Sequence, residues 1–382
     1  GQDIVRCKAN LMDMKISVIS SHKISVRAVV LVTVSAEEIY DREVIKKIEM
    51  DNVRDERLEV RMMKLIANRK DTFRIRESVN INQGMSNIGE IIWQELRVKD
   101  LCFTPADGRI DVKGNLSFFV IYQGENGGGL NYYDNVVPFS GSLDISNGRQ
   151  EDVYDINIVS CEKSLISRND GNGETRIFDG EIIMSLDICG YRNEDVSLLT
   201  DIYAPGYEIT PKTEKLEYER LVENKVVDID INERIKNEDG GKIIYTCGDV
   251  IVDEIIQKDN KIDIEGTISV QIMMEDKEAM PPITVSHHDI PFSYQAGMDK
   301  YEKDSELCGK VNNISLYSKR ISDKEISVNG TIKMEIMAKS TTTTPVVINA
   351  DVEKVPKEKL KNIPGITGYI VKEGCLLYTS PS

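Results

Sequence analysis

The stretch Ile262-Asp263-Ile264-Glu265-Gly266-Thr267-Ile268-Ser269-Val270 alternates apolar and polar residues on both sides of a central glycine. Alternation with a period of two is typical of a β-strand with one buried face and one solvated face, as in antiparallel sheets. The same pattern, Ile110-Asp111-Val112-Lys113-Gly114-Asn115-Leu116-Ser117-Phe118, places its glycine 152 positions earlier. The two stretches therefore predict equivalent strands of a repeated β-domain.

Two further motifs return at nearly the same spacing. Val137-Pro138-Phe139-Ser140 returns 153 positions later as Ile290-Pro291-Phe292-Ser293. Phe178-Asp179-Gly180-Glu181-Ile182 returns 150 positions later as Val328-Asn329-Gly330-Thr331-Ile332. Because three motifs keep one spacing, we predict a mainly β chain of tandem antiparallel sandwich or barrel-like domains of about 150 residues, with few short helices.

An earlier copy of the third motif, Ile24-Ser25-Val26-Arg27-Ala28-Val29-Val30, has no upstream partner for the other two motifs. We therefore expect the chain, which begins with Gly1, to be a fragment that opens inside a truncated repeat. The expected divisions are a partial repeat at 1–57, complete repeats at 58–215 and 216–352, a linker at 353–368, the start of another module at 369–374 and a non-native tail at 375–382.

The repeated glycines and prolines have predicted structural roles. A glycine inside a strand indicates a bulge or a close approach of another group to the backbone. A proline cannot donate to a strand ladder, which predicts a strand start or a sheet edge. The residues that we expect to define the repeat are Gly114, Gly180, Gly266, Gly330, Pro138, Phe139, Pro291 and Phe292.

The composition argues against several classes of function. The chain has 48 Lys and Arg against 64 Asp and Glu, a formal net charge of −16, which disfavours nucleic acid and anionic lipid as partners. It has no apolar run of about 18 residues, so we expect no membrane span. Its seven cysteines are widely spaced without a CxxC pair, which predicts reduced thiols in a cytosol.

No motif predicts catalysis, a cofactor or a metal. Gly124-Glu125-Asn126-Gly127-Gly128-Gly129 lacks the ending of a phosphate loop and predicts a hairpin turn. His287 and His288 are adjacent, so in a strand they point to opposite faces and do not share a metal. Asp111 and Asp263 recur as a candidate acid pair for hydrolysis, but we interpret them as solvated strand residues.

Cys7, Cys161 and Cys308 precede the third motif in their respective repeats. Our first interpretation is that they are buried small hydrophobic residues. The alternative is that they cross-link subunits of an assembly.

The strand I-D-[VI]-x-G followed by [VI]-P-F-S resembles the SPOCS domain, which occurs in tandem in spore-forming clostridia. Tyr369-Ile370-Val371-Lys372-Glu373-Gly374 resembles the first strand of a LysM module, with Tyr369, Val371 and Gly374 as its matching residues. This order is similar to that of the SipL-like spore coat morphogenetic proteins.

The resemblance implies a non-enzymatic protein that helps to build the spore coat through protein–protein contacts. It implies a location in the mother-cell cytoplasm at the forespore surface, other coat morphogenetic proteins as partners, and LysM binding to the ATPase of the basement layer. The alternative is a cell-wall protein in which LysM binds peptidoglycan or another N-acetylglucosamine polymer and the β-domains are spacers. Exposed aromatic pairs would favour that alternative, and Tyr132-Tyr133 is the candidate.

Overall fold

Antiparallel β-strands make up nearly the whole chain. A computed structural model describes residues 4–40, 42–50, 52–236, 241–276, 282–300, 302 and 305–355. These residues contain fourteen strands and no α-helix, only a short 3-10 turn, η1 (Glu125–Gly127), in the glycine-rich hairpin loop. The prediction of a mainly β chain built of antiparallel sheets is confirmed.

The first sandwich consists of two three-stranded sheets whose strand orders are β4-β5-β6 and β3-β8-β7. Alternate residues of the central strands β5 and β8 meet in one core, in which Leu116, Phe118 and Phe178 are completely buried. The strands are β3 (Arg54–Asn80), β4 (Ile88–Ala106), β5 (Arg109–Gly124), β6 (Leu130–Asp144), β7 (Val153–Asn169) and β8 (Thr175–Tyr203).

The second sandwich has the same arrangement, with strand orders β10-β11-β12 and β9-β14-β13. Its core is more aliphatic, and Ile264, Ile268 and Ile332 are completely buried there. The strands are β9 (Tyr207–Lys236), β10 (Lys242–Lys258), β11 (Lys261–Glu275), β12 (Ile283–Gly297), β13 (Glu306–Ser322) and β14 (Glu325–Lys354).

Upstream of both sandwiches, β1 (Ile4–Ser20) and β2 (Lys23–Glu37) form a two-stranded hairpin. Ala28 of β2 lies opposite Met14 of β1, just as Gly180 lies opposite Leu165 and Gly330 opposite Leu316. The hairpin therefore has the pairing of β7–β8 and of β13–β14. Residues 38–40 and 42–50, which follow it, have no regular secondary structure.

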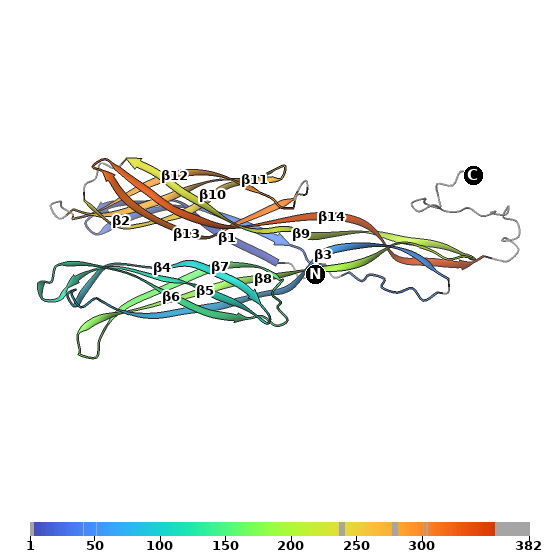
Figure 1. Cartoon of the computed structure of the whole chain (residues 1–382), viewed down its shortest axis with the longest axis horizontal. Helices are drawn as coiled ribbons and strands as arrows, with labels where there is room; N and C mark the ends of the chain where they lie inside the picture. The colour runs from blue at the N-terminus through green and yellow to red at the C-terminus, as the bar shows by residue number, and fades with distance from the viewer. Residues whose placement is uncertain are drawn as a thin grey trace.

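The two sandwiches lie side by side, and a narrow stem extends from them (Figure 1). Strands β3, β8, β9 and β14 are 27 to 30 residues long, so they continue beyond the cores of the sandwiches. In the stem the two strand pairs pack together around buried Val60, Leu198 and Val346. Packing of the β3–β8 pair against the β9–β14 pair thus connects the two sandwiches.

Candidate functional site

The first two repeated motifs form a single cross-strand element. Gly114 of β5 is paired with Phe139 of β6, and Gly266 of β11 with Phe292 of β12. A β-carbon added to Gly114 would lie 2.7 Å from Cζ of Phe139, and one added to Gly266 would lie 2.8 Å from the ring of Phe292. Each aromatic ring therefore covers a backbone position that only glycine leaves open.

An aspartate in a neighbouring bulge completes this element. The register of β4 with β5 shifts between Lys99 and Cys102, and Asp100 in this bulge has a positive φ of 53°. Nδ2 of Asn115, the residue after Gly114, donates to Oδ2 of Asp100 over 2.9 Å. The bulge lies beside the glycine, where the sequence predicted either a bulge or a close approach.

The second sandwich repeats this arrangement. The register of β10 with β11 shifts between Val252 and Glu254, next to Gly266. Oγ1 of Thr267 donates to Oδ2 of Asp253 over 3.4 Å. Sequence reasoning missed both aspartates, although Asp253 follows Asp100 by 153 positions, which is the spacing of the repeat.

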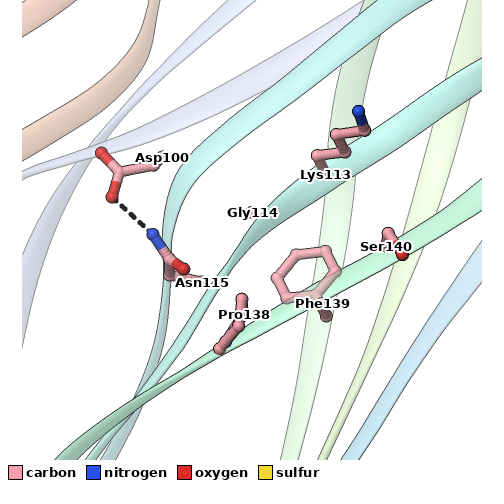
Figure 2. Close-up of a pocket in the computed structure, with 7 residues that line it drawn as sticks. All are labelled: Asp100, Lys113, Gly114, Asn115, Pro138, Phe139 and Ser140. Atoms are coloured by element: carbon pink, nitrogen blue, oxygen red, sulfur yellow. Dashed lines mark hydrogen bonds between the residues drawn. The ribbon is translucent and has the colours of Figure 1, made fainter.

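Around Gly114 the surface forms a shallow, open hollow (Figure 2). Asp100, on the rim of the hollow, also forms two hydrogen bonds to Asn313 of the second sandwich. The backbone N–H of Asp100 donates to Oδ1 of Asn313, and Nδ2 of Asn313 donates to Oδ1 of Asp100, both over 3.0 Å. Asp100 therefore joins the two sandwiches. The hollow is lined by Asp100, Lys113, Gly114, Asn115, Pro138, Phe139 and Ser140.

The third repeated glycine has a different role in each sandwich. A β-carbon on Gly180 would lie 2.5 Å from Cε1 of Phe118, which belongs to the opposite sheet. A β-carbon on Gly330 would instead meet the backbone oxygen of Ser315 on the neighbouring strand. The glycine thus allows close packing between sheets in the first sandwich and within a sheet in the second.

An aromatic cluster fills the junction between the outer faces of β4-β5-β6 and β10-β11-β12. Phe119 stacks on Tyr245 with ring centroids 4.3 Å apart, and Trp93 packs edge-on against both rings at 5.7 Å. The guanidinium of Arg97 in β4 adds a hydrogen bond to the backbone oxygen of Gly248 over 3.4 Å. These contacts make the junction between the sandwiches partly apolar and specific.

A polar cluster joins the base of the β1–β2 hairpin to both sandwiches. Arg6 bonds to Asp155 and donates to the hydroxyl of Tyr191 over 2.8 Å, and this hydroxyl donates to Glu37 over 2.8 Å. The ammonium of Lys339 lies 4.8 Å from the ring centroid of Tyr191 and 3.7 Å from Glu37. Burial is the main cause that raises the pKa of Tyr191, so its hydroxyl stays protonated.

Glu37, Cys189 and Lys339 lie nine positions after Ala28, Gly180 and Gly330, respectively. Corresponding positions of β2, β8 and β14 therefore lie at or beside this cluster.

The prolines lie in the outer strands β6 and β12, in keeping with their expected position at a sheet edge. His287 and His288 also lie in β12, and the described part of the chain contains no group of three side chains suited to a metal ion. The candidate acids make local ion pairs, Asp111 with Arg109 and Asp263 with Lys258. These acids are not brought together as a catalytic pair.

The prediction that Cys7, Cys161 and Cys308 are buried is wrong, because all three residues are exposed. They lie on the outer strands β1, β7 and β13 rather than in a core. Atoms around the Cys161 and Cys308 sulfurs still exclude enough water to raise the pKa of both thiols. Cys189, in contrast, is buried at the base of the hairpin.

The aromatic pair Tyr132-Tyr133 does not form an exposed platform for a sugar. Tyr133 is only 4% exposed, and its hydroxyl donates to the backbone oxygen of Asn80 over 3.2 Å. Tyr132 packs against the aromatic cluster at the junction between the sandwiches. The residues of the expected LysM start, Tyr369, Val371 and Gly374, lie outside the described residues, as do the expected tail and most of the linker.

Comparison with known proteins gives one match. Residues 87–163 match the family described as SipL, SPOCS domain. This segment runs from the start of β4 into β7 and contains Gly114, Pro138 and Phe139. Neither the curated proteins nor the solved structures include a match. Among the described residues, no helix has the length and apolar character needed to cross a membrane.

Proposed function

We propose that this chain is a non-enzymatic structural protein of the bacterial spore coat, built from tandem SPOCS domains and acting through protein–protein contacts. The observation that carries the proposal is the SPOCS match at residues 87–163. The matched family suggests a SipL-like protein of the spore coat. The forespore surface in the mother cell is the proposed location, and other coat morphogenetic proteins are the proposed partners.

The tandem arrangement is supported by matched pairing in the two sandwiches. Both have the same strand order, the same glycine–phenylalanine pair and the same bulge aspartate beside it. The β1–β2 hairpin supports a partial third unit, because it has the pairing of β7–β8. A LysM module starting at Tyr369 remains part of the proposal, with the basement-layer ATPase as its partner.

A structural rather than catalytic role is supported by how the polar side chains are used. Asp100, Asp152 and Asp155 are all committed to contacts that hold strands or sandwiches together. The hollow beside Gly114 is open and shallow, unlike the concave sites in which most enzymes enclose a substrate. Extended strands and sheet edges suit repeated protein–protein contacts.

The test is to express the full chain as a fluorescent fusion in a sporulating clostridial host and to follow it through sporulation. We expect a shell of fluorescence around the forespore and recovery of the protein in coat extracts. Diffuse fluorescence, or retention on purified peptidoglycan in a pull-down, would contradict the coat assignment. Retention on peptidoglycan would favour the cell-wall alternative.

A further inference from the structure

The two sandwiches have free sheet edges on opposite sides of the molecule. In the sheets β3-β8-β7 and β9-β14-β13, the edge strands β7 and β13 lie toward the junction, where Lys310 of β13 is 3.9 Å from Asp155 of β7 (Figure 1). The other edge strands, β3 and β9, therefore lie at the far sides of their sheets. Within the described residues, neither of these outer edges has a partner strand.

Both free edges belong to strands that alternate regularly between a buried and an exposed face. In β3, Arg74 is exposed between the buried residues Phe73 and Ile75. In β9, Asp228 is exposed between two buried neighbours. A regular strand edge with unpaired main-chain groups is a template for pairing with a strand of another chain.

The exposed face of β3 has an excess of positive charge. Arg74 and Arg76 share one carboxylate, that of Glu181 on β8, at 3.5 and 2.8 Å. Their side chains are 60 and 69% exposed. Two guanidinium groups thus have one carboxylate between them, and both remain accessible from the free edge.

The exposed face of β9 has the opposite excess. Asp228 lies 3.9 Å from the ammonium of Lys333 on β14, and its side chain is 60% exposed. Asp230 accepts a hydrogen bond from the hydroxyl of Thr331 over 3.3 Å, and among the described residues it has no cationic partner. Two carboxylates therefore have one ammonium between them, so the β9 edge is complementary in charge to the β3 edge.

One antiparallel register matches the two edges along their length. On the core side, two pairs of buried apolar residues come opposite each other. Three pairs of opposite charges also come opposite each other, and no two like charges do. The apolar pairs are Phe73–Ile229 and Ile75–Val227, and the charged pairs are Arg69–Glu233, Arg74–Asp228 and Glu77–Lys225.

Neighbouring registers are disfavoured. A shift of two residues in one direction would place Lys70 opposite Arg234, and a shift in the other direction would place Glu77 opposite Glu223. A shift of one residue would move the apolar residues of one strand to the exposed face. Inward-pointing charges such as that of Glu77 normally prevent pairing at an edge, but here each has an opposite charge as its partner.

We propose that the free edge of β3 in one copy of the chain pairs with the free edge of β9 in a second copy, in this antiparallel register. Such strand pairing supplies main-chain hydrogen bonds, and the charged pairs supply specificity. Because two different surfaces meet, each contact leaves one free β3 edge and one free β9 edge, to which further copies can add. This inference deepens the proposed function, on which it rests for its setting in the coat.

The same charges disfavour pairing of two identical edges. In a twofold pairing of two β3 edges centred on Ile75, Arg74 of each copy would lie opposite Arg76 of the other. In a twofold pairing of two β9 edges centred on Ile229, Asp228 would lie opposite Asp230. The association is therefore head to tail.

Sedimentation velocity of the full chain, over a range of protein concentrations at low salt, tests the proposal. We expect an open series of species larger than the monomer, which grows with protein concentration. Added salt should weaken the association, because the paired charges lie at an exposed edge. A monomer at every concentration, or a closed dimer, would overturn the proposal.

Charge reversal tests the predicted pair directly. Arg74→Glu should weaken self-association at least about tenfold, because it places a carboxylate opposite Asp228. Asp228→Arg should weaken it similarly. Lys319→Glu is the matched control for the first variant, because Lys319 is exposed on β13 and the change in net charge is the same. Equal losses in the Arg74 and Lys319 variants would contradict the predicted contact.

Mixing the two single variants provides the decisive arm. In an equimolar mixture of Arg74→Glu and Asp228→Arg chains, each contact between unlike chains again joins opposite charges. We therefore expect self-association to return in the mixture, and also in the double variant Arg74→Glu/Asp228→Arg. The double variant Arg74→Glu/Asp195→Arg has the same net charge and should not recover, because Asp195 is an exposed residue of the stem. Failure of both the mixture and the first double variant to recover would overturn the proposal.

Localisation during sporulation separates this inference from the proposed function. A chain that reaches the forespore surface but stays monomeric in solution would reject the edge pairing alone. Head-to-tail association without forespore localisation would reject the proposed function alone.

Discussion

Phe139 lies directly opposite Gly114 on the neighbouring strand, with its ring over the glycine backbone, and a β-carbon on Gly114 would be 2.7 Å from Cζ. Phe292 and Gly266 repeat this relationship in the second sandwich. An aromatic residue over a glycine pins the register of a strand pair and protects the exposed backbone. The two short motifs that recur in the sequence therefore recur because they are in contact.

Gly114→Ala should destabilise the first sandwich by about 1–3 kcal/mol, because the added methyl group collides with the Phe139 ring and the backbone oxygen of Lys99. Gly84→Ala is the matched control, since Gly84 has no atom within 4 Å of its β-carbon position. Urea unfolding of both variants measures the difference. Equal free energies of unfolding would contradict the role assigned to the ring contact.

The sequence predicted the strands more successfully than their contacts. Alternation and repeat spacing were sufficient to locate β5, β8, β11 and β14, because apolar and polar residues alternate around the glycine of each strand. They did not predict that Gly114 would face Phe139, since register depends on the length and geometry of the loop between the strands. The bulge at Asp100 was missed for the same reason.

Alternation of apolar and polar residues could not predict the junction between the sandwiches. Phe119 and Tyr245 lie on outer faces of their sheets, where alternation predicts solvent. They are buried because two sheets whose strands lie about 150 residues apart in the sequence pack together, and such long-range packing leaves no periodic signal. The polar cluster around Tyr191 was missed because its members come from five strands that are far apart in the sequence, β1, β2, β7, β8 and β14.

Tyr245→Ala should loosen the junction between the sandwiches and expose Trp93, which packs edge-on against it at 5.7 Å. Trp93 is the single tryptophan of the chain, so its fluorescence reports this junction directly. We expect a red shift of its emission in the folded variant. Tyr317→Ala is the control, because Tyr317 is 63% exposed on β13. Unchanged emission of the Tyr245 variant would show that the cluster does not depend on this ring.

Asp152→Asn should cost about 3 kcal/mol, because it leaves the guanidinium of Arg192 without its buried carboxylate partner. Nε and Nη2 of Arg192 donate to the two Asp152 oxygens over 2.6 and 2.8 Å. Asp195→Asn is the control, since Asp195 lies 3.6 Å from Arg61 with both side chains largely exposed. Urea unfolding at neutral pH compares the two variants, and similar losses would contradict a special role for Asp152.

The same pair predicts a dependence of stability on pH. Burial opposes ionisation of Asp152, but hydrogen bonds from Arg192 and from the backbone of Arg149 outweigh it and lower the pKa of the carboxyl. Because the pKa is lower in the folded state, ionised Asp152 stabilises the protein at pH values above the ordinary pKa of an unfolded aspartate, about 3.9. This contribution is lost as the pH falls through the folded-state pKa. The loss of stability below pH 4 should therefore be smaller in Asp152→Asn than in the wild type.

Alkylation with iodoacetamide should separate the cysteines by their environment. Cys102 is exposed, whereas Cys189 is 1% exposed, and burial is the main cause that raises the pKa of the Cys189 thiol. Since the thiolate is the reactive species, Cys189 should label at least about tenfold more slowly than Cys102 in the native protein at pH 8. Peptide mapping by mass spectrometry measures both rates, and 8 M urea, as the control, should make them similar. Fast native labelling of Cys189 would mean that the hairpin base opens readily, because Ile4 covers this residue together with Tyr191.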